Sequence, residues 1–220
     1  MNKAQLDELY HNLRVMSFSE DITQKEAVVG IVSHLTTPQG DYGGLLRFLN
    51  YYGDKYLLDD AVKLYTTHIS SPNSRRIVEF GAGLGWLGRG LSNRLTTKPP
   101  LLIDKRQWVG IDIVADIEST NGAARVLDAL DNSDVIVMSE FLHCLDNAKI
   151  TMEQFIPWPK LVIEYMPKGD SFKSASYQSS YNRQIGALGC KPVSSIGDIF
   201  PSSDIYDFST DTHSMWIVLS

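Results

Sequence analysis

The stretch of sequence that decides the fold is VEFGAGLGW, from Val78 to Trp86. A short apolar run leads into three alternating glycines, and the residues after them have the periodicity of an amphipathic helix. Glycine reaches backbone conformations that are closed to other residues, and it lets backbone amides approach a ligand beside a helix N-terminus. The stretch therefore predicts a strand, a ligand-binding turn and a helix, in that order.

The sequence that follows this turn alternates between strand-like and helix-like segments. Helices are predicted in LGWLGRGLSNRL and near residues 119–130 and 171–188, and the predicted strands are RIVEF, LLID, WVGIDIVADI, DVIVMSEF and KLVIEY. Such alternation predicts βαβ units, and therefore an α/β fold whose mostly parallel sheet carries helices on both faces.

The end of the chain has strand character without an intervening helix. The segments KPVSSIGDI and HSMWIVLS are predicted to pair as a terminal antiparallel hairpin, with IFPSSDIYDFSTDT as the loop between them. Because the chain ends inside a predicted strand, residues 71–220 are expected to form a complete α/β domain that binds a cofactor and carries the catalytic site.

Residues 1–70 are predicted to form a helical N-terminal cap. Apolar residues recur there at the i, i+3, i+4, i+7 spacing of amphipathic helices, and no strand-like segment interrupts them. A turn-rich linker, Ser71 to Ser74, separates the cap from the α/β domain. The four sets of apolar residues begin at Leu6, Val28, Tyr42 and Leu58.

The composition favours a soluble protein that acts on small molecules. The chain of 220 residues has a net charge of −6, and such a surface repels a nucleic-acid backbone. Neither a signal peptide nor an apolar run long enough to span a bilayer is visible, so no membrane partner is expected. Cys144 and Cys190 lie outside any metal-ligand spacing, so no metal site is expected and a cytoplasmic location is the simplest.

Two ligand classes fit the glycine turn. Gly83, Gly85 and Gly88 satisfy the dinucleotide fingerprint G-x-G-x-x-G. The wider pattern, an acidic residue followed by G-x-G-x-G, resembles the first motif of the class I, Rossmann-like S-adenosylmethionine-dependent methyltransferases. This resemblance implies a seven-stranded sheet with one reversed strand. It also implies that Glu79 lies near the methionine part of S-adenosylmethionine, with Gly81, Gly83 and Gly85 against the cofactor.

The resemblance implies further cofactor contacts from acidic residues at the ends of the next two strands. An acidic residue after the second strand would bind the ribose hydroxyls, and both Asp104, which ends LLID, and Asp112, which ends VGID, fit that position. Asp116 is similar to the third-strand residue that meets the adenine amino group. Asp104 and Asp116 are closer in sequence than the family pattern places them, so the helix between these strands is expected to be missing or reduced.

The segment DVIVMSEFLHCLDN resembles the fourth-strand motif of the small-molecule members of this family. The resemblance places Glu140 at the cofactor and His143 beside the transferred methyl group, where a histidine of the plant-type O-methyltransferases removes the acceptor proton. A histidine that only satisfies local backbone groups is the alternative. The segment KLVIEYMPKGD is similar to the fifth strand, so Glu164 is expected to face the cleft.

The sequence thus predicts an enzyme that transfers a methyl group from S-adenosylmethionine to an oxygen, sulfur or carbon atom of a small molecule. Two alternatives stay open. One is an NAD- or FAD-dependent oxidoreductase that uses the same glycine turn, and the other is a catalytically silent, methyltransferase-like scaffold subunit. Pairing of the helical cap between two copies would make a homodimer, for which the sequence has no signature.

Overall fold

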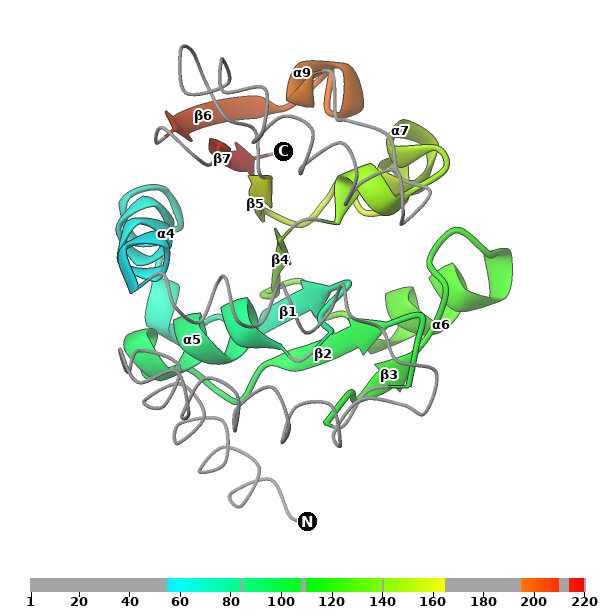
Figure 1. Ribbon diagram of the computed structural model, residues 1–220, viewed down its shortest axis with the longest axis horizontal. Helices are drawn as coiled ribbons and strands as arrows, with labels where there is room; N and C mark the ends of the chain where they lie inside the picture. The colour runs from blue at the N-terminus through cyan, green and yellow to red at the C-terminus, as the bar shows by residue number, and fades with distance from the viewer. Residues whose placement is uncertain are drawn as a thin grey trace, which may run out of the picture.

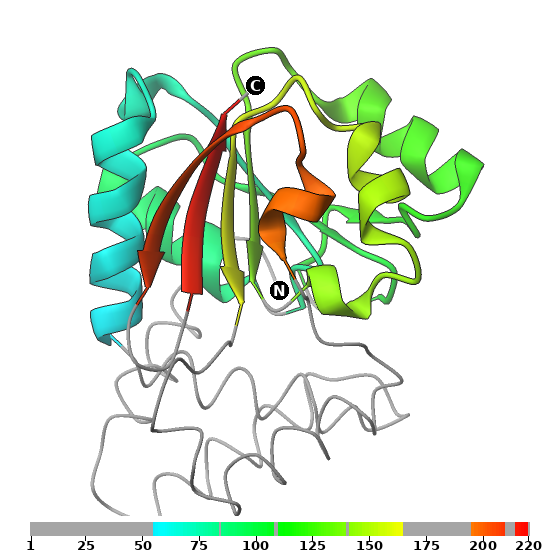
Figure 2. The ribbon, with the colours of Figure 1, turned by 90° about the horizontal axis from the view of Figure 1, so that it is seen from above.

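The computed structural model describes residues 55–83, 85–107, 110–139, 141–164, 195–209 and 214–219. These residues form one seven-stranded sheet with helices on both faces (Figures 1 and 2). The strands are β1 (Ile77–Phe80), β2 (Leu101–Asp104), β3 (Ile113–Val114), β4 (Val135–Ser139), β5 (Lys160–Glu164), β6 (Asp204–Ser209) and β7 (Ser214–Leu219).

The order of the strands in the sheet is β3-β2-β1-β4-β5-β7-β6. The five strands from β1 to β5 pair in parallel, whereas β7 runs antiparallel to both β5 and β6. The predicted fold class, a mostly parallel seven-stranded sheet closed by an antiparallel hairpin, is therefore confirmed. The chain moves outward from β1 to β3 and returns to β4 on the other side of β1. In open α/β sheets ligands bind at such a switch point, outside the carboxyl ends of the strands.

The helices divide between the two faces of the sheet, as Figure 2 shows. Helices α4 (Lys55–His68) and α5 (Trp86–Leu95) cover one face, and α6 (Thr120–Ala129), α7 (Ala148–Glu153) and α9 (Ile196–Ile199) cover the other. Two short 3-10 helices, η1 (Pro72–Ser74) and η2 (Leu142–Cys144), lie in connections. The strands are buried on both faces because apolar residues alternate between the layers: Val135 and Val137 of β4 face α5, and Ile136 and Met138 face α6 and α7.

The helix predicted from Leu58, Ala61, Val62 and Tyr65 is confirmed as α4. Ala61 and Tyr65 are fully buried in the same apolar cluster as α5 and the sheet, so this helix covers the sheet directly. The other three helices predicted for the cap, and the helix predicted near 171–188, lie outside the described residues. The division of the chain at residue 70 stays a prediction.

The predicted terminal hairpin exists, but its first strand is elsewhere in the sequence. Within KPVSSIGDI the described residues form α9, and β6 comes from DIYDFS, inside the segment that was predicted to be a loop. The reason is that β6 is an edge strand with solvent on one side, and such strands carry exposed polar residues. Asp204 and Asp207 are exposed and made the segment look like a loop, whereas Phe208 packs against the core.

The connection between β2 and β3 has no helix among its described residues, 105–107 and 110–112, in agreement with the prediction. Strand β3 itself contains only two residues. Along the described part of the chain, no helix is both long and apolar enough to cross a membrane.

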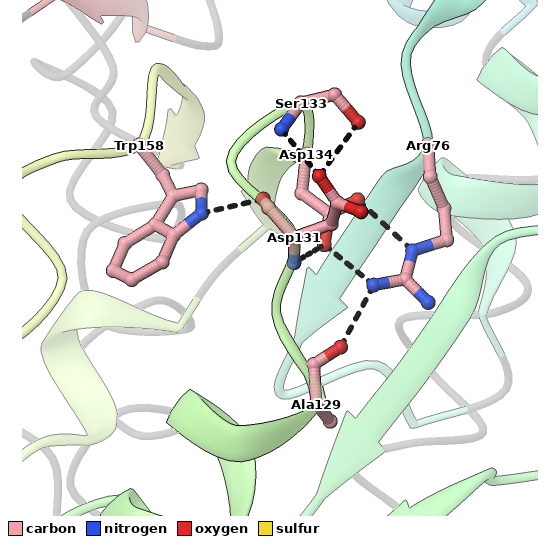
Figure 3. Close-up of polar contacts among 6 residues, drawn as sticks. All are labelled: Arg76, Ala129, Asp131, Ser133, Asp134 and Trp158. Atoms are coloured by element: carbon pink, nitrogen blue, oxygen red, sulfur yellow. Dashed lines mark hydrogen bonds and ion pairs between the residues drawn. The ribbon is translucent and has the colours of Figure 1, made fainter.

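A partly buried ion pair joins the amino ends of β1 and β4 (Figure 3). Arg76, just before β1, donates two hydrogen bonds to the carboxylate of Asp134, just before β4, at 2.9 and 2.6 Å. Arg76 also donates to the carbonyl of Ala129 at the end of α6, and the amide of Asp131 donates to Asp134. The hydrogen bond to Asp134 raises the pKa of Arg76. The polar groups at this edge thus pair with one another and connect β1, β4 and the end of α6.

Candidate functional site

The glycine turn connects the carboxyl end of β1 to the start of α5. Gly81, Gly83 and Gly85 all have positive φ angles, of 63°, 53° and 71°, which explains why the turn requires glycine. A Cβ on Gly81 would overlap the ring of Phe141, so that glycine allows the segment after β4 to pack on the turn. Apart from the two chain neighbours of Gly83, no described residue has an atom within 4 Å of where a Cβ on Gly83 would stand, so the described residues leave this part of the turn open.

Asp104, the last residue of β2, lies against the open part of the turn. Its Oδ2 atom accepts a hydrogen bond from the backbone amide of Gly83 at 2.9 Å, and its Oδ1 atom accepts one from the amide of Arg106 at 2.8 Å. These two bonds orient the half-buried carboxylate beside the space over Gly83. A ligand that lies across the turn can therefore donate hydrogen bonds from its hydroxyl groups to the carboxylate of Asp104.

Asp112, the competing candidate, has a different position. It precedes β3, and its Oδ2 atom accepts a hydrogen bond from the amide of Leu102, in the middle of β2, at 2.9 Å. The amide of Asp112 in turn donates to the carbonyl of Leu102. Asp112 thus extends the pairing between β2 and β3, at the level of Leu102, two residues before the end of β2. Asp104 is the candidate that contacts the glycine turn.

Asp116 follows β3 at the same edge as Asp104, because β2 and β3 pair in parallel with Asp104 opposite Val114. Its side chain is exposed, and Oδ1 accepts a hydrogen bond from the amide of Glu118 at 3.0 Å. The structure therefore brings Asp104 and Asp116 to one edge, with the carboxylate of Asp116 open to a ligand.

Glu79 is buried beneath the turn. Its Oε2 atom accepts a hydrogen bond from the amide of Gly88, in the first turn of α5, at 2.9 Å. Burial raises the pKa of Glu79 to about 8, although the amides of Gly88 and Leu87 and the charge of Arg89 favour the ionised form. The carboxyl group ties β1 to α5, and this accounts for an acidic residue in the strand without any ligand.

Of the two polar residues at the end of β4, the structure describes Ser139 and not Glu140. Glu140 lies outside the described residues. Ser139, which precedes it, is 6% exposed, and its hydroxyl group has no hydrogen-bond partner among the described residues.

His143 lies in η2, directly after β4, and it is 4% exposed. Its Nδ1 atom is 2.7 Å from Oε2 of Glu164, the last residue of β5, which is 2% exposed. The other oxygen, Oε1, accepts hydrogen bonds from the amides of Phe141 and Leu142 at 3.1 and 2.8 Å. One buried carboxylate therefore holds both the imidazole ring and the backbone that carries it.

The contact between His143 and Glu164 was not predicted from the sequence, although each residue was placed near the site. Neighbouring parallel strands end at the same edge of a sheet, so an acidic residue at the end of β5 and a histidine just after β4 are expected to meet. The contact with a carboxylate oxygen favours the tautomer that carries its proton on Nδ1, and in that tautomer Nε2 is the nitrogen without a proton. This is the arrangement of a general base with its orienting carboxylate.

No protein-family model matches the sequence, and no curated protein matches it either. Solved structures with a similar architecture include methyltransferases. An O-methyltransferase family protein from Burkholderia thailandensis is 11% identical, with a TM-score of 0.45 over 75% of this chain and 55% of that one. Mitomycin 7-O-methyltransferase is 12% identical, with a TM-score of 0.47 over 79% of this chain and 57% of that one.

A third similar structure is the plantazolicin methyltransferase in complex with a monoazolic desmethyl analog and SAH. It is 11% identical, with a TM-score of 0.44 over 98% of this chain and 99% of that one. This chain thus spans little more than half the length of the first two proteins and nearly the whole length of the third.

Proposed function

We propose that this protein is an S-adenosylmethionine-dependent methyltransferase that acts on a small molecule. The observation that carries the proposal is the contact between the carboxylate of Asp104 and the amide of Gly83, beside the open part of the glycine turn. A dinucleotide-binding sheet has a sixth parallel strand after β5. Here the antiparallel strand β7 stands in that place, which favours the methyltransferase over the oxidoreductase.

The residues at the carboxyl edge fit this cofactor. The turn from Gly81 to Gly85 would hold its amino-acid part, Asp104 would accept hydrogen bonds from the ribose hydroxyls, and Asp116 would accept one from the adenine amino group. Glu140 follows β4 and would complete the set. When bound, S-adenosylmethionine supplies an electrophilic methyl group on a sulfonium centre.

His143 would act as the general base toward a hydroxyl group of the acceptor. Glu164 accepts the Nδ1 proton and so keeps Nε2 basic, and Nε2 would take the acceptor proton as the oxygen is methylated. The carboxyl group of Glu164 would also stabilise the charged ring that results, because the pair is shielded from solvent. The buried pair thus favours an oxygen acceptor, since a thiolate or an acidic carbon acceptor needs positioning alone.

Ligand binding tests the cofactor assignment directly. A ligand that binds only the native state stabilises it by about 2.7 kcal/mol at a concentration 100-fold above Kd. Thermal unfolding is expected to shift upward with S-adenosylmethionine and with S-adenosylhomocysteine, and to stay unchanged with NAD or FAD. A shift with NAD or FAD and none with S-adenosylmethionine or S-adenosylhomocysteine would favour the oxidoreductase, and no shift with any of these ligands would refute the cofactor assignment.

A further inference from the structure

The segment from Phe141 to Asn147, which carries His143, is held at both ends by carboxylates from other elements. At its first end Glu164 binds the amides of Phe141 and Leu142. At its far end the amides of Asp146 and Asn147 donate to Oε1 of Glu118, at 2.7 and 3.3 Å. Glu118 lies between β3 and α6, so this second attachment joins the connection after β3 to the segment after β4.

The backbone that carries Glu118 is itself fixed to Asp116. The amide of Glu118 donates to Oδ1 of Asp116, and the carbonyl of Asp116 accepts hydrogen bonds from the amide and hydroxyl groups of Ser119, at 3.1 and 2.8 Å. Ser119 in turn caps α6 by accepting from the amide of Gly122. A Cβ on Gly122 would overlap the carbonyl of Asp116, so the turn packs tightly against the helix. Residues 116–119 therefore form a hydrogen-bonded turn that carries the carboxylates of Asp116 and Glu118.

We propose that Glu118 is a positioning residue that couples the adenine end of the cofactor site to His143. This inference rests on the proposed function, because Asp116 is the residue proposed to bind adenine. A ligand that engages Asp116 orders the turn 116–119. The turn places the carboxylate of Glu118, and that carboxylate holds the far end of the segment that carries the base. Occupation of the adenine site thereby sets the position of His143.

The chemistry of the contact defines the variants. One side-chain oxygen of Glu118 accepts from two adjacent amides, and the side chain of Asn147 is already engaged with the amide of Ile150. The variant E118A removes the acceptor, whereas E118Q retains a carbonyl oxygen at the same place. Glu153, an exposed carboxylate on α7 with no hydrogen bond to the segment, makes E153A the matched control.

Hydrogen exchange of the full-length protein, read by mass spectrometry on peptides that cover residues 141–147, tests the proposal. In E118A without ligand this segment is expected to exchange about tenfold faster than in the wild type, because two hydrogen bonds to a carboxylate are lost. S-adenosylhomocysteine is expected to slow exchange of the segment in the wild type, E118Q and E153A, but not in E118A. Because coupling between two sites is reciprocal, E118A also binds S-adenosylhomocysteine more weakly in calorimetry, and E153A does not.

The outcomes separate this inference from the function on which it rests. A wild type that binds no S-adenosylhomocysteine refutes the proposed function, and the coupling falls with it. If the wild type binds this ligand and E118A shows wild-type exchange, or the same protection by the ligand, Glu118 does not couple the two sites. Failure of E118Q to restore protection, with the melting temperature unchanged, also overturns the role of the carbonyl acceptor.

Discussion

The buried carboxyl group of Glu79 predicts a specific dependence of stability on pH. Its pKa of about 8 in the folded protein lies above the ordinary value of 4.5 for an exposed glutamic acid. Between these two values the native state binds a proton that the unfolded chain has released, so the free energy of unfolding falls as pH rises from 4.5 to 8. The difference corresponds to about 5 kcal/mol, at roughly 1.4 kcal/mol per pKa unit.

Replacement by glutamine removes this dependence and keeps the shape of the side chain. In E79Q the amide oxygen can still accept the hydrogen bond of Gly88, while the amide protons add a cost that does not change with pH. The E79Q variant is therefore expected to lose stability less steeply than the wild type between pH 5 and pH 8. From pH 5 to pH 8 the difference in unfolding free energy between the two proteins should shift in favour of E79Q by about 3–4 kcal/mol, since the rest of the ~5 kcal/mol falls outside this pH range.

Urea unfolding at pH 5, 6, 7 and 8, followed by circular dichroism, measures the effect, since urea leaves the ionic strength low and constant. The variant E153Q is the control, because Glu153 is an exposed carboxylate on α7. The informative quantity is the difference in unfolding free energy between wild type and variant at each pH, in which all other titrations cancel. Parallel pH profiles for the wild type and E79Q would show that Glu79 is ionised in the fold, and the reasoning from burial would be refuted.

Three further predictions concern the site and the amino edge. In calorimetry D104A is expected to weaken binding of S-adenosylhomocysteine by about 1.5–3 kcal/mol, the range for hydrogen bonds to charged groups, and D112A to leave it within about 0.5 kcal/mol; the reverse order would place the ribose at Asp112. Once an acceptor with a hydroxyl group is found, H143A is expected to lower kcat by about 10²–10⁴ with cofactor affinity retained, and an unchanged kcat would point to an acceptor that needs no base. Breaking the ion pair at the amino edge with D134A is expected to cost about 1–3 kcal/mol of stability, because the partly buried Arg76 and the amide of Asp131 lose their acceptor. The control D128A, at an exposed position on α6, should cost less than about 0.5 kcal/mol.

The two strands of the terminal hairpin show which parts of the fold the spacing of apolar residues predicts and which it does not. Strand β7 is buried over nearly its whole length, and its apolar run predicted it correctly. Its partner β6 is an edge strand with exposed aspartates, and the sequence placed that strand too early, in the segment that forms α9. Apolar residues indicate a strand only where the structure buries them. An edge strand such as β6 has exposed polar residues, so its own composition does not predict it, and its position follows from its pairing with β7.

The amino-acid sequence predicts the glycine turn, the helices α4, α5 and α6, and the parallel strands from β1 to β5, because each follows from the spacing of apolar residues or from the φ angles that glycine permits. The different positions of Asp104 and Asp112 follow from the tertiary structure alone, because both residues end an apolar run and differ in the backbone amide that donates to the carboxylate, Gly83 for Asp104 and Leu102 for Asp112. The tertiary structure also joins His143 to Glu164 and Glu118 to the segment that carries this histidine. These contacts connect residues far apart in the chain, and the order of strands in the sheet, which local spacing does not encode, brings them to one edge.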